Sequence, residues 1–270
     1  MTADGQHRRA TTTADSWPAS LGQGSASVEV DSAAARDLPK DLHVVAPTLS
    51  TTARLRKLAA ARPELSSAPA EFGKRVFDII GATLMLIVLS PLILAVVLAI
   101  RIEGQPVLFR HKRIGFHGKV FHCLKFRTMV PNAEQVLRHM LHAHPEVRDE
   151  WTENHKLRDD PRITRVGRLL RLTSLDELPQ LINILRGEMS LVGPRPVVRA
   201  ELLRYGRDVA SYLAVKPGLT GLWQVKGRSD TTYRRRVAMD KYYVRNRSIR
   251  LDLYIVLATV GVVLKRAGAY

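Results

Sequence analysis

The sequence contains few of the residues on which several common kinds of site depend. It has a single cysteine, Cys123, so no disulfide can form within the chain and no cysteine-rich zinc site can be built. Aromatic residues make up only 6%, which argues against a surface that stacks nucleobases. The GxxxxGK[ST] phosphate loop, the GxGxxG dinucleotide motif and the HExxH zinc motif are absent.

Acidic residues are also scarce relative to basic ones. The chain has 25 Asp and Glu against 42 Lys and Arg, which gives a formal net charge of +17. Such an excess favours an anionic partner: nucleic acid, a phosphorylated small molecule or an anionic membrane face.

Residues 1–70 have no sustained apolar period and are rich in Ala, Ser, Thr and Asp. Their beginning has no continuous apolar core of the kind found in a signal peptide. We therefore expect residues 1–70 to form a disordered N-terminal tail. A short basic helix over residues 55–61 is an open alternative to continued disorder.

Residues 76–100 are almost uniformly apolar. At 1.5 Å per residue, a helix of this length can cross a hydrocarbon core of about 30 Å, so the segment predicts membrane insertion. Pro91, preceded by Ser90, removes a backbone donor near the middle and predicts a break in the helix. The Ser90 hydroxyl can bond a carbonyl that the proline leaves free.

Both flanks of this segment are basic, with Lys74 and Arg75 before it and Arg101 after it. The positive-inside tendency places both flanks on the cytoplasmic side. A re-entrant membrane helix over residues 71–101, which enters and leaves by the same face, satisfies both observations. An ordinary kinked single span is the alternative.

Residues 102–270 predict a domain on the cytoplasmic face of the membrane. The expected fold class is α+β: a mostly helical, membrane-associated domain with a re-entrant membrane helix hairpin and short strands. The last helix either lies in the membrane interface or packs on the domain core. Strands are expected at 107–109 and 120–124, and helices at 131–141, 162–172, 175–185 and from 240 through 251–264.

The pair Asp176 and Glu177 stands at a predicted helix start and has two interpretations. Ser174 with Glu177 fits a capping box, and Asp176 alone fits an N-cap. Alternatively, the helix N-terminus keeps Asp176 ionised as a nucleophile, while Glu177 holds a divalent ion on phosphate oxygens. An anionic substrate would also need cations nearby, and the candidates are Lys125, Arg127, Arg168, Arg171 and Arg195.

Two loops rich in proline and glycine follow the carboxylates. In the first, Pro194 and Pro196 flank Arg195 and restrict where its side chain can reach. The second, at residues 216–221, precedes Trp223, which either stacks on a base or sugar or belongs to the core.

Seven motifs together resemble the monotopic phosphoglycosyl transferases of bacteria, the bacterial sugar transferase family, over about 200 residues. The likeness is closest to the undecaprenyl-phosphate glucose or galactose phosphotransferases. The motifs are KRxxDxxG at 74–81, Ser90-Pro91, KFRTM at 125–129, DPRITRVGRLLR at 160–171, SLDELPQLINILRGEMSLVGPRP at 174–196, KPGLTGLWQVKGR at 216–228 and GAY at 268–270.

The resemblance implies transfer of a sugar-1-phosphate from a UDP-sugar to undecaprenyl phosphate. Asp176 would attack the sugar-bearing phosphorus, release UMP and hold the phosphosugar, which polyprenyl phosphate then removes. Glu177 would help to hold Mg²⁺. The resemblance assigns phosphate contacts to Lys125, Arg171 and Arg195, to which the KFRTM motif adds Arg127, and it assigns the hairpin break to Ser90 and Pro91.

The resemblance also implies that the protein lies on the cytoplasmic face of the inner membrane. Its implied role is the first membrane step in the synthesis of an exopolysaccharide, a capsule or an O-antigen type glycan. The implied partners are membrane lipids, the two substrates and, as one option, a second copy of the chain, but not nucleic acid. Larger members carry an N-terminal membrane domain, for which residues 1–70 have no apolar run. The alternative function is a membrane-tethered nucleic-acid-binding or scaffold protein. The sugar is not determined.

Overall fold

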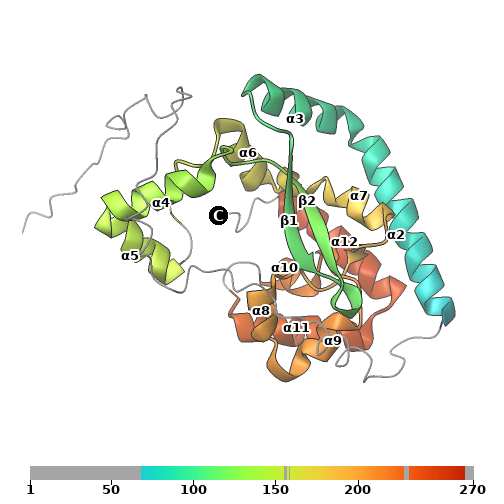
Figure 1. Ribbon diagram of the computed structural model, residues 1–270. Helices are drawn as coiled ribbons and strands as arrows, with labels where there is room; N and C mark the ends of the chain where they lie inside the picture. Colours follow the sequence, from blue (N-terminus) through green and yellow to red (C-terminus); the bar gives the residue numbers. More distant parts are fainter. Residues whose placement is uncertain (1–67, 155–156, 158, 228–230, 265–270) are drawn as a thin grey trace, which may run out of the picture. The chain divides into compact units, whose positions relative to one another are not determined.

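The computed structural model describes residues 68–154, 157, 159–227 and 231–264, all of which belong to one compact unit (Figure 1). The predicted tail up to residue 67, the predicted helix at 55–61 and the terminal GAY motif lie outside the described residues.

The apolar segment forms two helices, α2 (Ala68–Val88) and α3 (Ser90–Ile102), which are bent by 63° at the break between them. Pro91 cannot donate to the carbonyl of Ile87 one turn earlier. The Ser90 hydroxyl donates to that carbonyl instead, at 2.8 Å. The predicted break and the predicted role of Ser90 are both confirmed.

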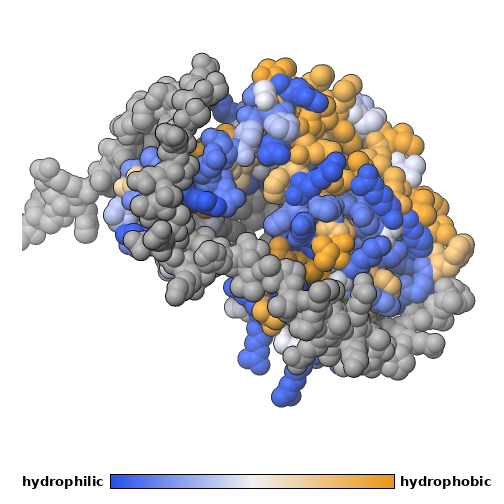
Figure 2. All heavy atoms as spheres, in the orientation of Figure 1, coloured by the Kyte–Doolittle hydropathy of each residue, from blue (hydrophilic) through white to orange (hydrophobic). Residues whose placement is uncertain are grey.

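Among the described helices, none is by itself long and apolar enough to cross a membrane. The bent pair α2–α3 meets the length and composition test only when its two helices are taken together. Its outward side chains are apolar, and Ile80, Leu84 and Ile87 are each at least 60% exposed. Figure 2 shows this apolar surface following α2 and α3.

Strands β1 (Leu108–Ile114) and β2 (Val120–Phe126) form an antiparallel hairpin in which Phe109 faces Lys125 and Arg113 faces Phe121. Both predicted strands are present, and β1 runs five residues beyond its predicted end. Because alternate residues share a face, Arg113, Cys123 and Lys125 lie on one side of the hairpin.

The next helices are α4 (Ala133–Ala143), α5 (Pro145–Asn154) and α6 (Arg165–Thr173). Helix α6 begins later than predicted because the Thr164 hydroxyl caps it, accepting from the amide of Gly167 at 2.9 Å. The single helix predicted at 175–185 is two elements, the 3-10 turn η4 (Leu175–Glu177) and helix α7 (Gln180–Leu185).

The rest of the domain contains several short elements that the sequence pattern did not predict. Strand β3 (Ser190–Val192) pairs in parallel with β4 (Gly218–Thr220). The two strands approach so closely that a Cβ on Gly218 would lie 2.1 Å from the amide nitrogen of Gly193. The other short elements are α8 (Arg199–Leu203), η5 (Gly206–Asp208), α9 (Val209–Leu213) and α10 (Leu222–Lys226). The helical region predicted from 240 through 251–264 is present as two helices, α11 (Tyr233–Asn246) and α12 (Ile249–Leu264).

The main core lies between the inward faces of α2, α7, β2 and α12. Trp223 is 7% exposed and belongs to the core, as the second interpretation of this residue expected. Helix α12 buries Asp252 and Ile255 and exposes Leu253 and Leu257, so one face packs on the core while the other remains apolar and open.

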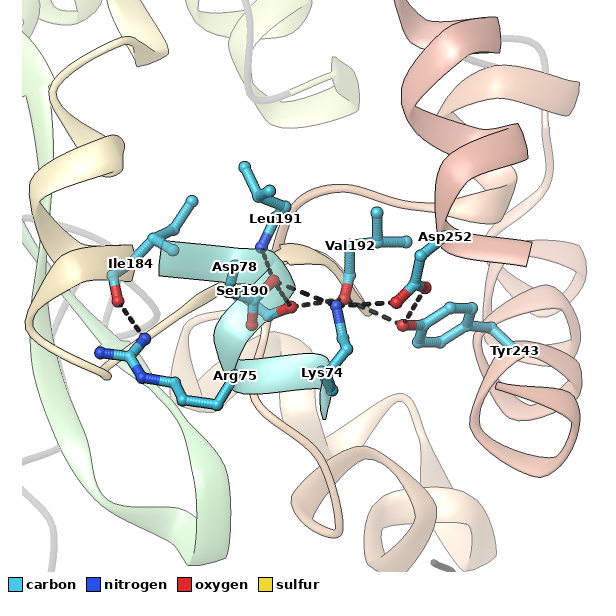
Figure 3. Close-up of polar contacts among 9 residues, drawn as sticks. All are labelled: Lys74, Arg75, Asp78, Ile184, Ser190, Leu191, Val192, Tyr243 and Asp252. Atoms are coloured by element: carbon cyan, nitrogen blue, oxygen red, sulfur yellow. Dashed lines mark hydrogen bonds and ion pairs between the residues drawn. The ribbon is translucent and has the colours of Figure 1, made fainter. Parts of the chain in front are cut away.

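A buried polar cluster fastens α2 to the domain, and we call Lys74, Asp78, Ser190, Tyr243 and Asp252 the anchor cluster (Figure 3). The Lys74 ammonium lies 3.2 Å from Asp78 and 2.9 Å from Asp252. Asp78 also accepts from the Ser190 hydroxyl at 2.9 Å and from the amide of the next residue in β3 at 3.0 Å. Tyr243 donates to Asp252 at 2.8 Å. The cluster thereby joins α2, β3, α11 and α12.

Candidate active site

The two candidate carboxylates lie in the turn between α6 and α7. Ser174 ends α6 in the left-handed conformation, with φ at 58°, and its side chain makes no capping bond. Helix α7 begins only at Gln180, with Pro179 as its N-cap residue. Both capping interpretations are therefore wrong, because the left-handed Ser174 ends one helix before the carboxylates and the next helix starts after them.

Lys125 of β2 joins the two carboxylates. Its Nζ lies 3.2 Å from Oδ2 of Asp176 and 2.7 Å from Oε1 of Glu177, and donates to both. The three side chains are 14–24% exposed, so the group is only partly shielded from solvent. The bonds are charge-assisted, which makes them stronger than bonds between neutral groups.

Asn183 sets the distance between α7 and β2. Its Oδ1 accepts from the amide of Leu124 at 3.0 Å, and its Nδ2 donates to the carbonyl of His122 at 2.8 Å. The side chain thus occupies an edge position beside β2, and Figure 1 shows α7 next to the hairpin. Asn183 is fully buried, and it fixes α7 at the level of Lys125.

The pKa values of the two carboxyl groups move in opposite directions. Burial raises the pKa of Asp176, and this effect outweighs the lowering by Lys125. Burial also acts to raise the pKa of Glu177, but Lys125 and then Arg195 outweigh it, so that pKa is lowered. Lys125, on a distant strand, is the group that most favours the ionised form of each carboxyl group, whereas the sequence suggested a helix N-terminus in this role; for Asp176 the effect of burial is larger still.

The cations divide into two groups around this pair. Arg171 of α6 acts electrostatically on Asp176, and its Nε donates to the hydroxyl of Thr128 at 2.9 Å. Arg195, in the turn after β3, acts on Glu177. Lys125 stands between the two groups, within reach of both carboxylates.

A small pocket, with a volume of about 10 Å³, lies on the Glu177 side of Lys125. Two of its residues, Lys125 and Arg195, were predicted as phosphate ligands. Basic and amide side chains dominate its lining, which consists of Arg113, Cys123, Lys125, Glu177, Gln180, Arg195, Pro196, Leu219 and Gln224. Three cations around one carboxylate suit an anionic ligand.

Arg127 and Arg168, which were also candidates, make their described contacts elsewhere. Arg127 donates to the carbonyls of Pro106 and Leu108, at 3.2 and 3.5 Å. Arg168 lies 3.3 Å from Asp159 in an exposed pair. The structure therefore brings Lys125, Arg171 and Arg195 to the carboxylates but directs these two arginines away from them. Ser90 and Pro91 lie at the bend of α2–α3.

The sequence analysis did not identify Arg113, Thr128, Gln180 or Gln224 as site residues. Arg113 could have been found only from the hairpin register, which places it on the face that carries Lys125. Gln180 is 2% exposed and lies at the first position of α7. In the sequence it cannot be distinguished from any other helix residue.

Within residues 68–154, 157, 159–227 and 231–264, no group of three His, Cys, Asp or Glu side chains could hold a metal ion. Asp176 and Glu177 offer two carboxylates. That donor set suits Mg²⁺, which commonly takes one or two carboxylates and completes its shell with water and substrate phosphates.

Comparison with known proteins gives consistent results. The family described as Bacterial sugar transferase matches residues 69–266. The chain is 50% identical over 206 residues to the UDP-galactose-lipid carrier transferase of Erwinia amylovora and to the undecaprenyl-phosphate galactose phosphotransferase of Salmonella typhimurium. In both cases the match covers 76% of this chain but only 43% of the relative.

A shorter relative is covered almost completely. The exopolysaccharide production protein ExoY of Sinorhizobium fredii is 50% identical over 198 residues, which are 73% of this chain and 88% of the relative. The carboxylate pair, the pocket and the bent helix pair all fall within the matched residues, and this chain belongs to the bacterial sugar transferase family.

Proposed function

We propose that this protein transfers a sugar-1-phosphate from a UDP-sugar, UDP-glucose or UDP-galactose, to undecaprenyl phosphate. The observation that carries the proposal is the position of Lys125, which bonds to both Asp176 and Glu177 and lines, together with Glu177, a small cationic pocket. The names of the relatives, among them a UDP-glucose:undecaprenyl-phosphate glucose-1-phosphate transferase from Caulobacter vibrioides, support this reaction.

The reaction proceeds in two displacements at the same phosphorus. A carboxylate oxygen of Asp176 attacks the sugar-bearing phosphorus of the UDP-sugar, and the bond to the bridging oxygen breaks. UMP leaves with the electron pair of that bond, and the phosphosugar remains as an acyl phosphate ester on Asp176. An oxygen of undecaprenyl phosphate then attacks this phosphorus, the ester bond breaks, and undecaprenyl diphosphosugar leaves while Asp176 regains its carboxylate.

Lys125, Arg171 and Arg195 each have a task in this scheme. Lys125 orients the Asp176 carboxylate through its Nζ before the substrate binds and faces the phosphoryl oxygens afterwards. Arg171, beside Asp176, stabilises the charge that develops on the transferred phosphoryl group. Arg195 is held in a turn between two prolines and contacts the diphosphate from the Glu177 side.

Glu177, together with substrate phosphate oxygens, would hold Mg²⁺, which neutralises phosphate charge when it is bound. The pKa of Glu177 is lowered by Lys125 and Arg195 against the effect of burial, so this carboxylate is available to a cation at neutral pH.

The bent pair α2–α3 is proposed to be a re-entrant membrane helix that enters and leaves through the cytoplasmic face of the inner membrane. Its exposed apolar side chains and its bend of 63° support this topology. The open apolar face of α12 is proposed to lie in the interface, where the lipid substrate would be delivered.

The reaction is tested with purified protein in lipid nanodiscs, undecaprenyl phosphate and a panel of UDP-sugars, with UMP release as the readout. We expect Mg²⁺-dependent release from one UDP-hexose, and a mass increase of one phosphosugar on the protein when the lipid acceptor is left out. If Asp176→Asn still releases UMP at the wild-type rate, the assigned nucleophile is wrong.

The topology is tested with single cysteines at positions 70 and 104 in a Cys123→Ser background. A membrane-impermeant thiol reagent should reach both positions from the cytoplasmic side only. Labelling of the two positions from opposite sides would rule out the re-entrant helix.

A further inference from the structure

Arg113 is a largely buried cation of the pocket to which the proposed mechanism assigns no task. It lies in β1, in the sequence His-Lys-Arg-Ile-Gly, and lines the pocket together with Lys125, Glu177 and Arg195. Its side chain is 15% exposed, whereas its neighbours Arg110 and Lys112 on the same strand are exposed. Since long basic side chains are seldom this buried, the position of Arg113 calls for a specific reason.

Two neighbours orient the guanidinium group of Arg113. Its Nη1 donates to Oε2 of Glu201 at 3.2 Å, and its Nη2 lies 3.2 Å from Nδ1 of His111. The pKa of His111 is lowered by burial and then by Arg113 and Lys125, so the ring is neutral and can accept this bond. Glu201 is in turn held by the amide of Val198 at 3.1 Å. These two bonds use two of the five guanidinium N–H donors.

The backbone fastens Arg113 to the segment that carries Arg195. The hydroxyl of Tyr212 donates to the carbonyl of Ile114 at 2.7 Å and accepts from the amide of Val197 at 3.1 Å. The amide of Ile114 also donates to the carbonyl of Val197 at 3.0 Å. Because Ile114 follows Arg113 directly and Val197 lies two residues after Arg195, the two arginines keep a fixed relation at the pocket.

The charges around the carboxylates distinguish two ends of the site. Lys125 and Arg171 act on Asp176, whereas Lys125, Arg195 and Arg113 act on Glu177. In the proposed reaction the transferred phosphorus must contact Asp176. The cations left for the other phosphate of the diphosphate are those on the Glu177 side, where Arg113 and Arg195 line the small pocket.

We infer that Arg113 binds the phosphate that stays with the nucleotide, which is the phosphate of UMP, and that Glu201 is a positioning residue for its guanidinium group. The inference rests on the proposed function and adds the binding site of the leaving group to it. It assigns Arg113 to UMP binding and Arg171 to the phosphoryl group that is transferred.

The test measures the affinity of the full-length protein in nanodiscs for UMP, by calorimetric titration. We expect Arg113→Gln to weaken UMP binding about 10–100-fold, the range for loss of a charge-assisted contact to phosphate, and Arg113→Lys to recover part of it. Glu201→Gln should weaken UMP binding by a smaller factor. The matched control is Arg110→Gln, which removes an exposed charge from the same strand and should leave the affinity unchanged.

Kinetics separate this role from a structural one. Because the nucleotide phosphate is bound in both the ground state and the transition state, Arg113→Gln should raise KM for the UDP-sugar more than it lowers kcat. Thermal unfolding reports whether the variant is folded. If Arg113→Gln alone unfolds, the double variant Arg113→Gln/Glu201→Gln leaves no unpaired carboxylate and takes its place.

The outcomes are distinct. Wild-type affinity for UMP in a folded Arg113 variant overturns the inference and leaves the proposed function standing. An equally large loss of UMP affinity in Arg110→Gln has the same consequence, because it would show that the effect is not specific to Arg113. No binding of UMP to the wild-type protein contradicts the proposed function itself.

Discussion

The anchor cluster and the group formed by Lys125, Asp176 and Glu177, which we call the carboxylate site, are both clusters of charged side chains. They differ in how far they are exposed to solvent and in the balance of positive and negative charge. In the anchor cluster, Lys74 meets two carboxylates, and the side chains of Asp78 and Asp252 are 2% and 1% exposed. In the carboxylate site, Asp176 and Glu177 are 14% and 22% exposed, and the cations around them outnumber them.

The difference separates a cluster that holds the fold from one that binds a ligand. In the anchor cluster the one lysine is already shared by two deeply buried carboxylates, so the contribution of this cluster is to fix the geometry of the elements it joins. A partly open site with excess cations has unsatisfied electrostatic potential, which an anion can satisfy. Changes in the two clusters should therefore act on different measurements.

The largest effect is expected from Asp176→Asn. The amide cannot form the phosphosugar ester, so the rate of UMP release should fall by about 10⁴-fold or more. Lys125 keeps its 2.7 Å bond to Glu177, so the midpoint of thermal unfolding should stay near that of the wild type. A large drop in this midpoint would mean that Asp176 stabilises the fold, as the residues of the anchor cluster do.

Lys125→Met is expected to reduce the transfer rate by about 10²–10³-fold, the range for removal of one preorganised group that stabilises the transition state. It also leaves two adjacent carboxylates, only 14% and 22% exposed, without their shared cation, so the free energy of unfolding should fall, but by less than in the more deeply buried anchor cluster. Steady-state kinetics and denaturant unfolding measure the two quantities. If Lys125→Met unfolds the protein but leaves the transfer rate of the folded fraction near that of the wild type, Lys125 stabilises the fold in the way that the anchor cluster does, and the comparison of the two clusters is wrong.

Lys74→Met is the corresponding change in the anchor cluster, and the balance of effects should reverse. It leaves Asp78 and Asp252 buried without their cation, which should cost about 3 kcal/mol of unfolding free energy. The affinity for UMP should change little in the protein that remains folded. Lys112→Met, at an exposed position of β1, is the matched control. Loss of UMP binding without loss of stability would show that the anchor cluster is part of the site.

The smallest effect is expected in the pH dependence of Arg171→Gln. Burial already raises the pKa of Asp176, so activity should decline with falling pH earlier than for an ordinary aspartate. Arg171 acts to lower that pKa, and its removal should shift the acidic limb of the pH–rate profile to higher pH. A shift to lower pH would place Arg171 away from Asp176.

Parts of the fold that depend on local chemistry were predictable. The break at Ser90-Pro91 follows from the missing proline donor, and the bond from Ser90 to the carbonyl of Ile87 was expected. The hairpin strands and the helices α4 and α6 were predicted to within a few residues except at the end of β1. The capping interpretation failed because Ser174 adopts a left-handed conformation, which few non-glycine residues do and which the sequence pattern does not reveal.

Between β3 and α10, a series of short elements takes its shape from contacts with distant parts of the chain. Strand β3 is held by Asp78 of α2 and pairs with β4. Neither contact can be recognised from the pattern of apolar residues in a strand of three residues. Segments this short have too few residues to show a helix or strand period.

The sequence by itself determined the bent apolar segment and the excess of basic charge, because each depends on neighbouring residues or on composition. It pointed to the two carboxylates through the resemblance to a family, since their spacing alone also allowed a helix cap. Only the tertiary structure decided which cations meet those carboxylates. Lys125 lies 51 residues from Asp176 and reaches it because Asn183 holds α7 against β2, while Arg127, two residues further along, faces away. Such pairings depend on hairpin register and helix packing, which are set by contacts across the whole domain and not by local backbone preference.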